Sequence, residues 1–338
     1  MTTQHLNLVQ EPAPRPVVIV GYGHAGRNLH RNALEQLGRP VDLYAVDPAY
    51  DASPDDVPLL PDLADCGTIA PIGDIVFHVT TPPADHVPTV TKLVELGARS
   101  IIVEKPVART PRDAWLLRSL GRNCEIVPMS VWPHSRVTTR VIELLAAGTI
   151  GAVRSLDFEQ NKPRFARPDG HRSAFSVELP HQVLLALHLA GGDATVAQAA
   201  SRPAPELGGT GCMMGGADLT LLHDNGVIST LRSDLTAPER RRRLRVTGDR
   251  GEIIADYPLG EGSHCGQVRV SDRPGRALIE DRPIDQFLDA AYSFFDGNGP
   301  RPVCGLRLHQ QTTVLLAEAE TLALDSVLDS YDRELVLS

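Results

Sequence analysis

The sequence has little of what usually identifies a small-domain framework or a membrane protein. Its five cysteines are scattered without a Cys-x-x-Cys pair, which argues against a zinc site and against a disulfide framework. No apolar run approaches the ~18 residues that cross a bilayer. The polar segment 1–15 has neither the basic flank nor the apolar core of a secretion signal. We therefore expect reduced thiols, a cytoplasmic location, no membrane partner and no metal.

Lysine is almost missing. Of 33 basic residues, only Lys92, Lys105 and Lys162 are lysines, so arginine is used nearly everywhere that a cation is sufficient. A lysine at the end of a strand is then a candidate for chemistry, because an ammonium group changes its protonation more readily than a guanidinium group does. Lys105 holds such a position, with a surface lysine at a strand end as the alternative reading.

Basic residues are fewer than acidic ones, 33 against 42. The formal net charge of −9 disfavours a nucleic-acid partner. The one basic cluster, residues 240–243, is interpreted as a solvated loop beside a strand, since most short charge runs face water. A hydrophobic fraction of 42% is typical of a globular protein, and 338 residues are enough for two domains.

Strands and helices alternate in the first part of the chain, which predicts a parallel sheet. The expected strands are 16–20, 41–46, 74–79, 100–103 and 125–129. After the first strand, Ala25, Leu29, Ala33 and Leu37 recur every four residues and predict one helix face, which ends at Gly38. We expect a doubly wound Rossmann domain over residues 16–148, after the polar tail 1–15.

The second part is richer in strands. Segments 153–161, 217–222, 227–231 and 244–246 alternate as strands do, one helix is expected at about 180–189, and the tail from Ile284 is helical. The pattern predicts an α+β domain over residues 149–338, with a largely antiparallel open sheet.

A glycine-rich turn follows the first predicted strand. Gly21, Gly23 and Gly26 fit G-x-G-x-x-G, in which Tyr22, His24 and Ala25 fill the other positions. Such a turn brings the backbone close to a pyrophosphate at a helix N-terminus. Asp47 ends the next strand, about 20 residues on, where a carboxylate accepts hydrogen bonds from the adenosine ribose. It repels a 2′-phosphate, so we expect NAD(H) rather than NADP(H).

The segment Ile101 to Pro106, with its Glu-Lys-Pro ending, resembles the Gfo/Idh/MocA family, the glucose-fructose oxidoreductase and inositol dehydrogenase group. The segments 74–82 and 144–153 are similar to this family as well, and the likeness covers nearly the whole chain. The resemblance implies a nicotinamide-dependent oxidoreductase. It also implies that the cofactor contacts include Thr80, Thr81, Pro82, His86, Glu104 and Lys105.

Two groups would handle the substrate proton. Lys105, beside the nicotinamide, is one, and His181 is the other, because Pro180 suits a first helical turn whose positive end lowers the pKa of a histidine. The alternative for His181 is a hydrogen-bonded interface histidine. Family members place an Asp four residues before this His; here that position holds Val177, and Glu178 is the less certain substrate contact.

Two further residues are candidates for the substrate pocket. Lys162 follows the strand that would floor the pocket, although a solvated lysine is an equal reading. Trp132 would lie where the two domains meet, and core packing is its alternative.

These residues predict hydride transfer between a nicotinamide and a sugar, a cyclitol, an amino sugar or an aminoglycoside. Two alternatives stay open: a ketoreductase of a nucleotide-linked keto sugar, which an arginine-lined pocket would favour, and a non-catalytic sensor of the same fold. The uncovered face of the second sheet would pair copies into a homodimer or homotetramer.

Overall fold

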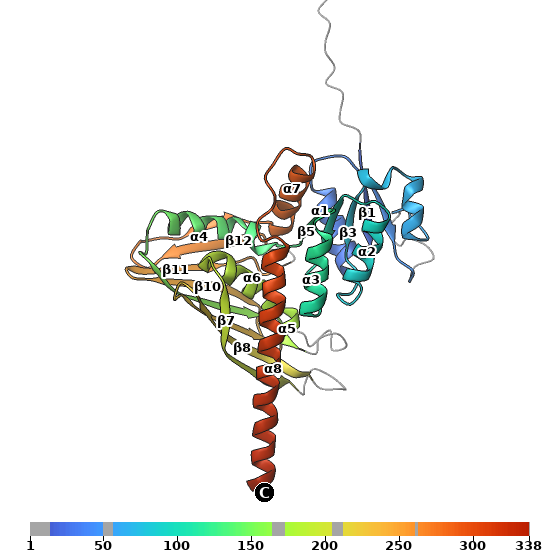
Figure 1. Cartoon of the computed structure of the whole chain (residues 1–338). Coiled ribbons are helices and arrows are strands. Elements are labelled where there is room, and N and C mark those ends of the chain that lie inside the picture. The colour runs from blue at the N-terminus through green and yellow to red at the C-terminus, as the bar shows by residue number, and fades with distance from the viewer. Residues whose placement is uncertain (1–13, 50–56, 164–172, 205–211, 261–262, 338) are drawn as a thin grey trace, which may run out of the picture.

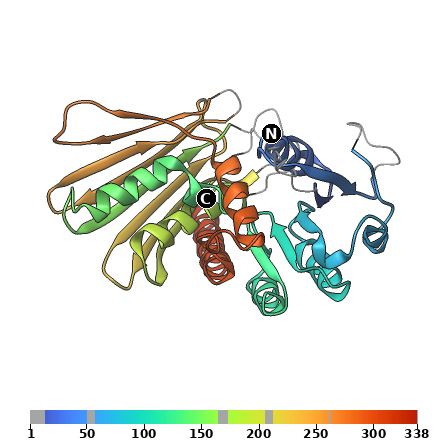
Figure 2. The ribbon, with the colours of Figure 1, turned by 90° about the horizontal axis from the view of Figure 1, so that it is seen from above.

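The computed structural model describes residues 14–49, 57–163, 173–204, 212–260 and 263–337. It contains two sheets that lie side by side, each with helices of its own (Figure 1). Viewed from above, the C-terminal helices, orange and red, lie between the two sheets (Figure 2). Among the described helices, none has both the length and the apolar character that crossing a bilayer requires.

The first sheet is parallel throughout, as the sequence predicts. Its strand order is β2-β1-β3-β4-β5. The strands are rich in valine and isoleucine because both faces of the sheet are covered. They are β1 (Arg15–Val20), β2 (Val41–Val46), β3 (Val76–Val79), β4 (Ser100–Val103) and β5 (Glu125–Pro128). The order reverses between β1 and β3, where open α/β sheets bind their ligands.

Helices cover both faces of this sheet. One face packs against the π-helical turn η1 (Gly26–Arg31), α1 (Asn32–Glu35) and α7 (Pro283–Phe295). The other packs against α2 (His86–Glu95), α3 (Pro111–Leu120) and the short 3-10 helices η2 (Leu63–Thr68) and η3 (Ile72–Asp74). The late segment α7 therefore returns to the first sheet.

The helix after the glycine turn differs from its prediction. Of the expected face, Ala33 is fully buried, whereas Ala25 and Leu29 are only partly buried. The positions that face the sheet include Gly26, His30 and Leu34. The wide π turn after Gly26 shifts the buried face, and a four-residue repeat counted from Ala25 misses this. Gly38 has a φ of 70°, as its predicted role after the helix requires.

The second sheet has eight strands in the order β13-β12-β11-β10-β6-β9-β8-β7. All its pairings are antiparallel except that of β6 with β9, so the predicted fold class is confirmed. The strands are β6 (Val153–Asn161), β7 (Ala194–Ala204), β8 (Cys212–His223), β9 (Ile228–Asp234), β10 (Arg241–Gly248), β11 (Gly251–Asp256), β12 (Cys265–Val270) and β13 (Ala277–Glu280).

One face of the second sheet carries the larger core. The helices on it are α4 (Arg136–Ala146), α5 (Ala174–Val177), α6 (Leu179–Ala190) and α8 (Leu306–Leu337). Val137 and Leu144 of α4 belong to this core, although they precede the predicted boundary between residues 148 and 149. That boundary stays a prediction. The opposite face carries ion pairs, among them Arg241 with Glu159 at 3.1 Å.

Candidate active site

The glycine turn between β1 and η1 is built by close backbone approach. Gly21 has a φ of 90°, and a Cβ on it would lie 2.6 Å from the Thr81 backbone nitrogen. A Cβ on Gly26 would lie 2.5 Å from the Gly21 carbonyl oxygen. Gly23 differs, because beyond its chain neighbours no heavy atom of the described residues lies within 4 Å of where its Cβ would be. The turn is therefore closely packed at Gly21 and Gly26 and open at Gly23.

Asp47 lies beside this turn. Its Oδ2 accepts a hydrogen bond from the Tyr22 backbone N–H at 2.6 Å, and its Oδ1 accepts one from the Ala49 N–H at 2.9 Å. The Tyr22 side chain is fully buried in the core, so only its backbone lies in the turn. His24 is exposed, its Nδ1 lies 3.0 Å from Asn28 Nδ2, and Ala25 precedes the first turn of η1.

The Thr-Pro and Glu-Lys-Pro segments lie next to the glycine turn. The Thr80 backbone N–H donates to the Val20 carbonyl at 2.8 Å, with Thr81 and Pro82 following. His86 is fully buried behind both segments: its Nε2 lies 2.8 Å from the Thr81 carbonyl oxygen and its Nδ1 lies 3.0 Å from that of Pro106. His86 thus joins the two segments, and it can influence a bound cofactor only through their backbone.

Lys105 reaches from the first sheet to the second domain. Its backbone N–H donates to Glu104 Oε2 at 2.9 Å, and its Nζ donates to the Val177 carbonyl oxygen at 3.5 Å. Because Val177 ends α5, directly before the helix that carries His181, the contact brings both predicted proton-transfer groups to one place.

His181 lies in the first turn of α6, with Pro180 just before it, as predicted. Its ring packs edge-on against Trp132 of η4 (Trp132–His134), with 6.1 Å between ring centroids. Burial, followed by the charges of Lys105 and Arg242, holds the pKa of His181 well below its usual range. The imidazole is therefore neutral at physiological pH and can accept a proton.

Glu178 and Lys162 form a pair beside this histidine. Glu178 is buried, its Oε1 lies 3.7 Å from Lys162 Nζ, and its other oxygen accepts a hydrogen bond from the Gln160 side chain. Gln160 lies on β6 and is absent from the sequence-based site. The ion pair accounts for the burial of Glu178, which a lone carboxylate would resist.

Arg242 corrects the interpretation of the basic run. The run lies mostly on β10 and not in a solvated loop, and the Arg242 guanidinium stacks over Trp132 at 4.9 Å from the ring centroid. The signal was available in the sequence, because period-two alternation from Val246 and Leu244 places Arg242 on the buried face of the strand. Arg241, one residue earlier, points to the opposite face.

A narrow pocket of about 20 Å³ lies among these side chains. Trp132, which lines this pocket, has its Nε1 buried without a hydrogen-bond partner among the described residues. The residues that line the pocket are Trp132, Phe158, Glu159, Gln160, His181, Gln182, Leu185, Arg242, Arg243 and Tyr257.

The geometry fits a dinucleotide. The open space over Gly23 leaves room for a pyrophosphate against the turn, and Asp47 retains acceptor capacity beside it. Lys105, at the end of β4, lies between this turn and the His181 pocket.

Comparison with known proteins gives a family match over part of the chain and a fold. Residues 138–254 match the family model described as the GFO/IDH/MocA C-terminal domain. No protein in the curated set matches the chain by sequence. Similar structures include the 3-ketoreductase KijD10 from Actinomadura kijaniata in complex with NADP and TDP-benzene (TM-score 0.76, 15% identity, 91% of this chain and 98% of that one).

Two further structures share the fold. The UDP-N-acetylglucosamine 3-dehydrogenase GnnA from Acidithiobacillus ferrooxidans has a TM-score of 0.71 at 14% identity, over 92% of this chain and 98% of that one. An oxidoreductase from Thermotoga maritima has a TM-score of 0.75 at 15% identity, over 92% and 97%.

Proposed function

We propose that this chain, whose residues 138–254 match the GFO/IDH/MocA C-terminal domain, is a nicotinamide-dependent oxidoreductase that interconverts a secondary alcohol and a ketone on a sugar-like substrate. The observation that carries the proposal is the meeting of Lys105, from the nucleotide-binding sheet, with the helix of His181, from the second domain. A site of this kind needs residues from both domains, because cofactor and substrate must meet.

The two groups have distinct roles. A bound nicotinamide supplies the carbon that accepts or delivers the hydride. His181 is neutral because of burial and nearby cations, and during alcohol oxidation it takes the hydroxyl proton. During ketone reduction it returns this proton to the oxygen. The Lys105 ammonium donates a hydrogen bond to the reacting oxygen and stabilises its negative charge as it develops.

The cofactor we propose is NAD(H). The Asp47 carboxylate, beside the glycine turn, would repel a 2′-phosphate, and no arginine follows it in residues 48–51. NADP is the cofactor bound to the KijD10 structure, so the choice in this chain is a matter for direct binding.

For the substrate, the charges favour an anionic group. Lys105, Lys162 and Arg242 all act on His181, and Glu178 is already paired with Lys162. Such surroundings repel the ammonium of an amino sugar or aminoglycoside and attract a phosphate. We therefore place the nucleotide-linked sugar ahead of the amino sugar. The KijD10 complex with TDP-benzene and the GnnA activity on a UDP-sugar, each a property of that protein, are in keeping with this.

The test is a tryptophan-fluorescence titration with NADH and with NADPH, followed by absorbance at 340 nm with free sugars, cyclitols, amino sugars and UDP- or TDP-sugars. We expect NADH binding and turnover of a nucleotide-linked sugar, which Lys105→Ala and His181→Ala abolish. Lys92→Ala, at an exposed lysine on α2, is the matched control. Binding without turnover of any substrate would move the sensor alternative to the front.

We further propose that the charged face of the eight-stranded sheet pairs two or more copies of the chain. The ion pair between Arg241 and Glu159 lies on a polar, partly exposed face that a second copy could cover. Size-exclusion chromatography with light scattering measures the number of subunits directly, and a monomer at micromolar concentration would rule the pairing out.

A further inference from the structure

Four polar side chains form a connected row inside the nucleotide-binding domain, between the first sheet and its helices η1 and α7. Tyr292 Oη lies 3.0 Å from His78 Nε2, His78 Nδ1 lies 2.7 Å from His30 Nδ1, and His30 Nε2 lies 3.0 Å from Glu104 Oε1. The two histidines and Tyr292 are fully buried, and Glu104 is nearly so. We call these four residues the histidine relay.

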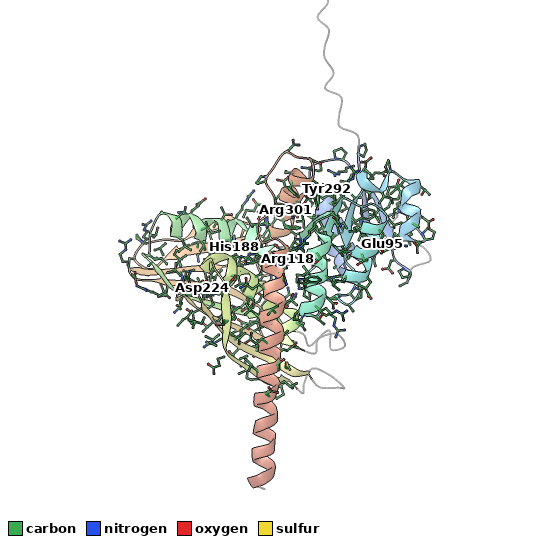
Figure 3. The ribbon with its side chains drawn as sticks, in the orientation of Figure 1. Glu95, Arg118, His188, Asp224, Tyr292 and Arg301 are labelled. Carbon is green, nitrogen blue, oxygen red and sulfur yellow. The ribbon has the colours of Figure 1, made fainter. Side chains whose placement is uncertain are left out.

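The relay joins elements far apart in sequence. His30 comes from η1, His78 from β3, Glu104 from the turn after β4, and Tyr292 from α7, where Figure 3 labels it. It ends at the residue next to Lys105, whose backbone N–H donates to the other oxygen of Glu104. A buried polar group that loses its partner costs free energy, so every contact in the relay must be satisfied.

Hydrogen counting gives the relay one direction. The Glu104 carboxylate only accepts, so a His30 ring with one hydrogen carries it on Nε2. Its Nδ1 is then an acceptor, His78 donates from Nδ1, and the Tyr292 hydroxyl donates to His78 Nε2. In the reverse direction Glu104 carries the proton, and the Tyr292 hydrogen needs an acceptor that the described residues do not provide. Direction and the ionisation of Glu104 are therefore linked.

The electrostatics agree with this direction. Burial alone would raise the pKa of Glu104, yet the hydrogen bond from His30 and the charge of Lys105 lower it. Burial holds the pKa of His78 well below its usual range, so His78 carries one ring hydrogen. The other charged groups near the relay are Arg15, Arg39 and Asp296 at the Tyr292 end, and the titratable His86 at the Glu104 end.

We propose that His30 and His78 are positioning residues. Their hydrogen bonds all point the same way, from Tyr292 to Glu104, and hold the Glu104 carboxylate ionised and in place beside Lys105. The relay also ties α7, which follows the second sheet in the chain, to the Glu-Lys-Pro turn. The inference rests on the proposed role of Lys105, whereas its first test requires no turnover.

The first test is NMR of the protein labelled with ¹⁵N in its histidine rings, without added cofactor, with signals assigned by His30→Gln and His78→Gln. We expect the Nε2–H tautomer for His30, the Nδ1–H tautomer for His78, and a nitrogen–nitrogen coupling across their shared hydrogen bond. Tyr292→Phe removes the donor to His78 Nε2, so the ¹⁵N signal of that nitrogen should move, while His78 keeps its hydrogen on Nδ1 because His30 Nδ1 still accepts it. The reverse tautomers in the wild type, or an unchanged His78 Nε2 signal in Tyr292→Phe, would overturn the relay.

The second test asks whether the relay acts on Glu104. In His30→Leu, the midpoint pH of the Glu104 carboxyl, followed by ¹³C NMR, should rise by about one pH unit or more, because a charge-assisted hydrogen bond is lost. The pH profile of turnover should move with it. His223→Gln removes another buried histidine, bonded to Ser229 Oγ at 2.8 Å, and should change neither reading.

The possible results distinguish failure of the relay from failure of the proposed oxidoreductase function. An unchanged Glu104 midpoint in a folded His30→Leu would reduce the relay to ordinary packing. If His30→Leu does not fold, the tautomers of the wild type and of Tyr292→Phe still decide the proposal. A confirmed relay in a protein without turnover would contradict the proposed oxidoreductase and leave the relay standing.

Discussion

Two glycines of the same turn should respond to alanine in opposite ways. A Cβ on Gly26 would lie 2.5 Å from the Gly21 carbonyl oxygen and 2.9 Å from Ile19 Cγ2, so backbone must move. Overpacking of this kind costs about 1–3 kcal/mol of unfolding free energy. Beyond its chain neighbours, a Cβ on Gly23 meets no heavy atom of the described residues within 4 Å, and this residue is outside the positive-φ region. Gly23→Ala should leave stability unchanged or raise it by about 0.4–1 kcal/mol.

Cofactor binding should show the complementary pattern. The methyl group in Gly23→Ala would occupy the open space where we expect the pyrophosphate, so the Kd for NADH should rise at least about tenfold, which is ~1.4 kcal/mol. Urea unfolding gives the stability of both variants, and fluorescence titration gives the Kd. Wild-type NADH affinity in a folded Gly23→Ala would refute the reasoning, because the dinucleotide could not then lie over this turn.

Three further results are expected. His181→Ala should lower turnover by about 10²–10⁴-fold at saturating cofactor while NADH affinity stays constant, with His188→Gln on the same helix as control; an equal loss in both variants would remove the proton-transfer role. Arg242→Gln should raise the KM for a nucleotide-linked sugar about tenfold and leave that for an uncharged sugar unchanged, whereas Arg241→Gln should alter neither steady-state value. Burial lowers the pKa of His309 to about 3, so the unfolded chain binds a proton that the folded protein does not, and below about pH 6.5 the free energy of unfolding should fall by about 1.4 kcal/mol per pH unit for this group. Because other buried histidines also have lowered pKa values, urea unfolding from about pH 7.5 to pH 5 is compared between the wild type and His309→Gln, and an equal pH dependence in both would mean that His309 is protonated in the folded state.

The corrections to the sequence-based site have a common origin. A cluster of four arginines predicts a solvated run, but Arg242 lies on a strand, where alternate positions face opposite sides of the sheet. The four-residue repeat from Ala25 missed His30, since a π turn changes the helical period. Both errors concern which side chains face inward, and local repeats describe that only for regular elements.

The sequence by itself determined the parallel order of the first domain, the glycine turn with Asp47, and the place of Lys105 at a strand end. These features depend on local periodicity and on short spacings, which neighbours in the chain impose. Only the tertiary structure decided that Lys105 reaches Val177, that Glu178 pairs with Lys162, and that Tyr292 joins the histidine relay. His78 and Tyr292 are 214 positions apart in the chain, and their contact exists because α7 packs back onto the first sheet. No local pattern encodes such a contact, because it is set by which buried surfaces fit together once the domains have formed.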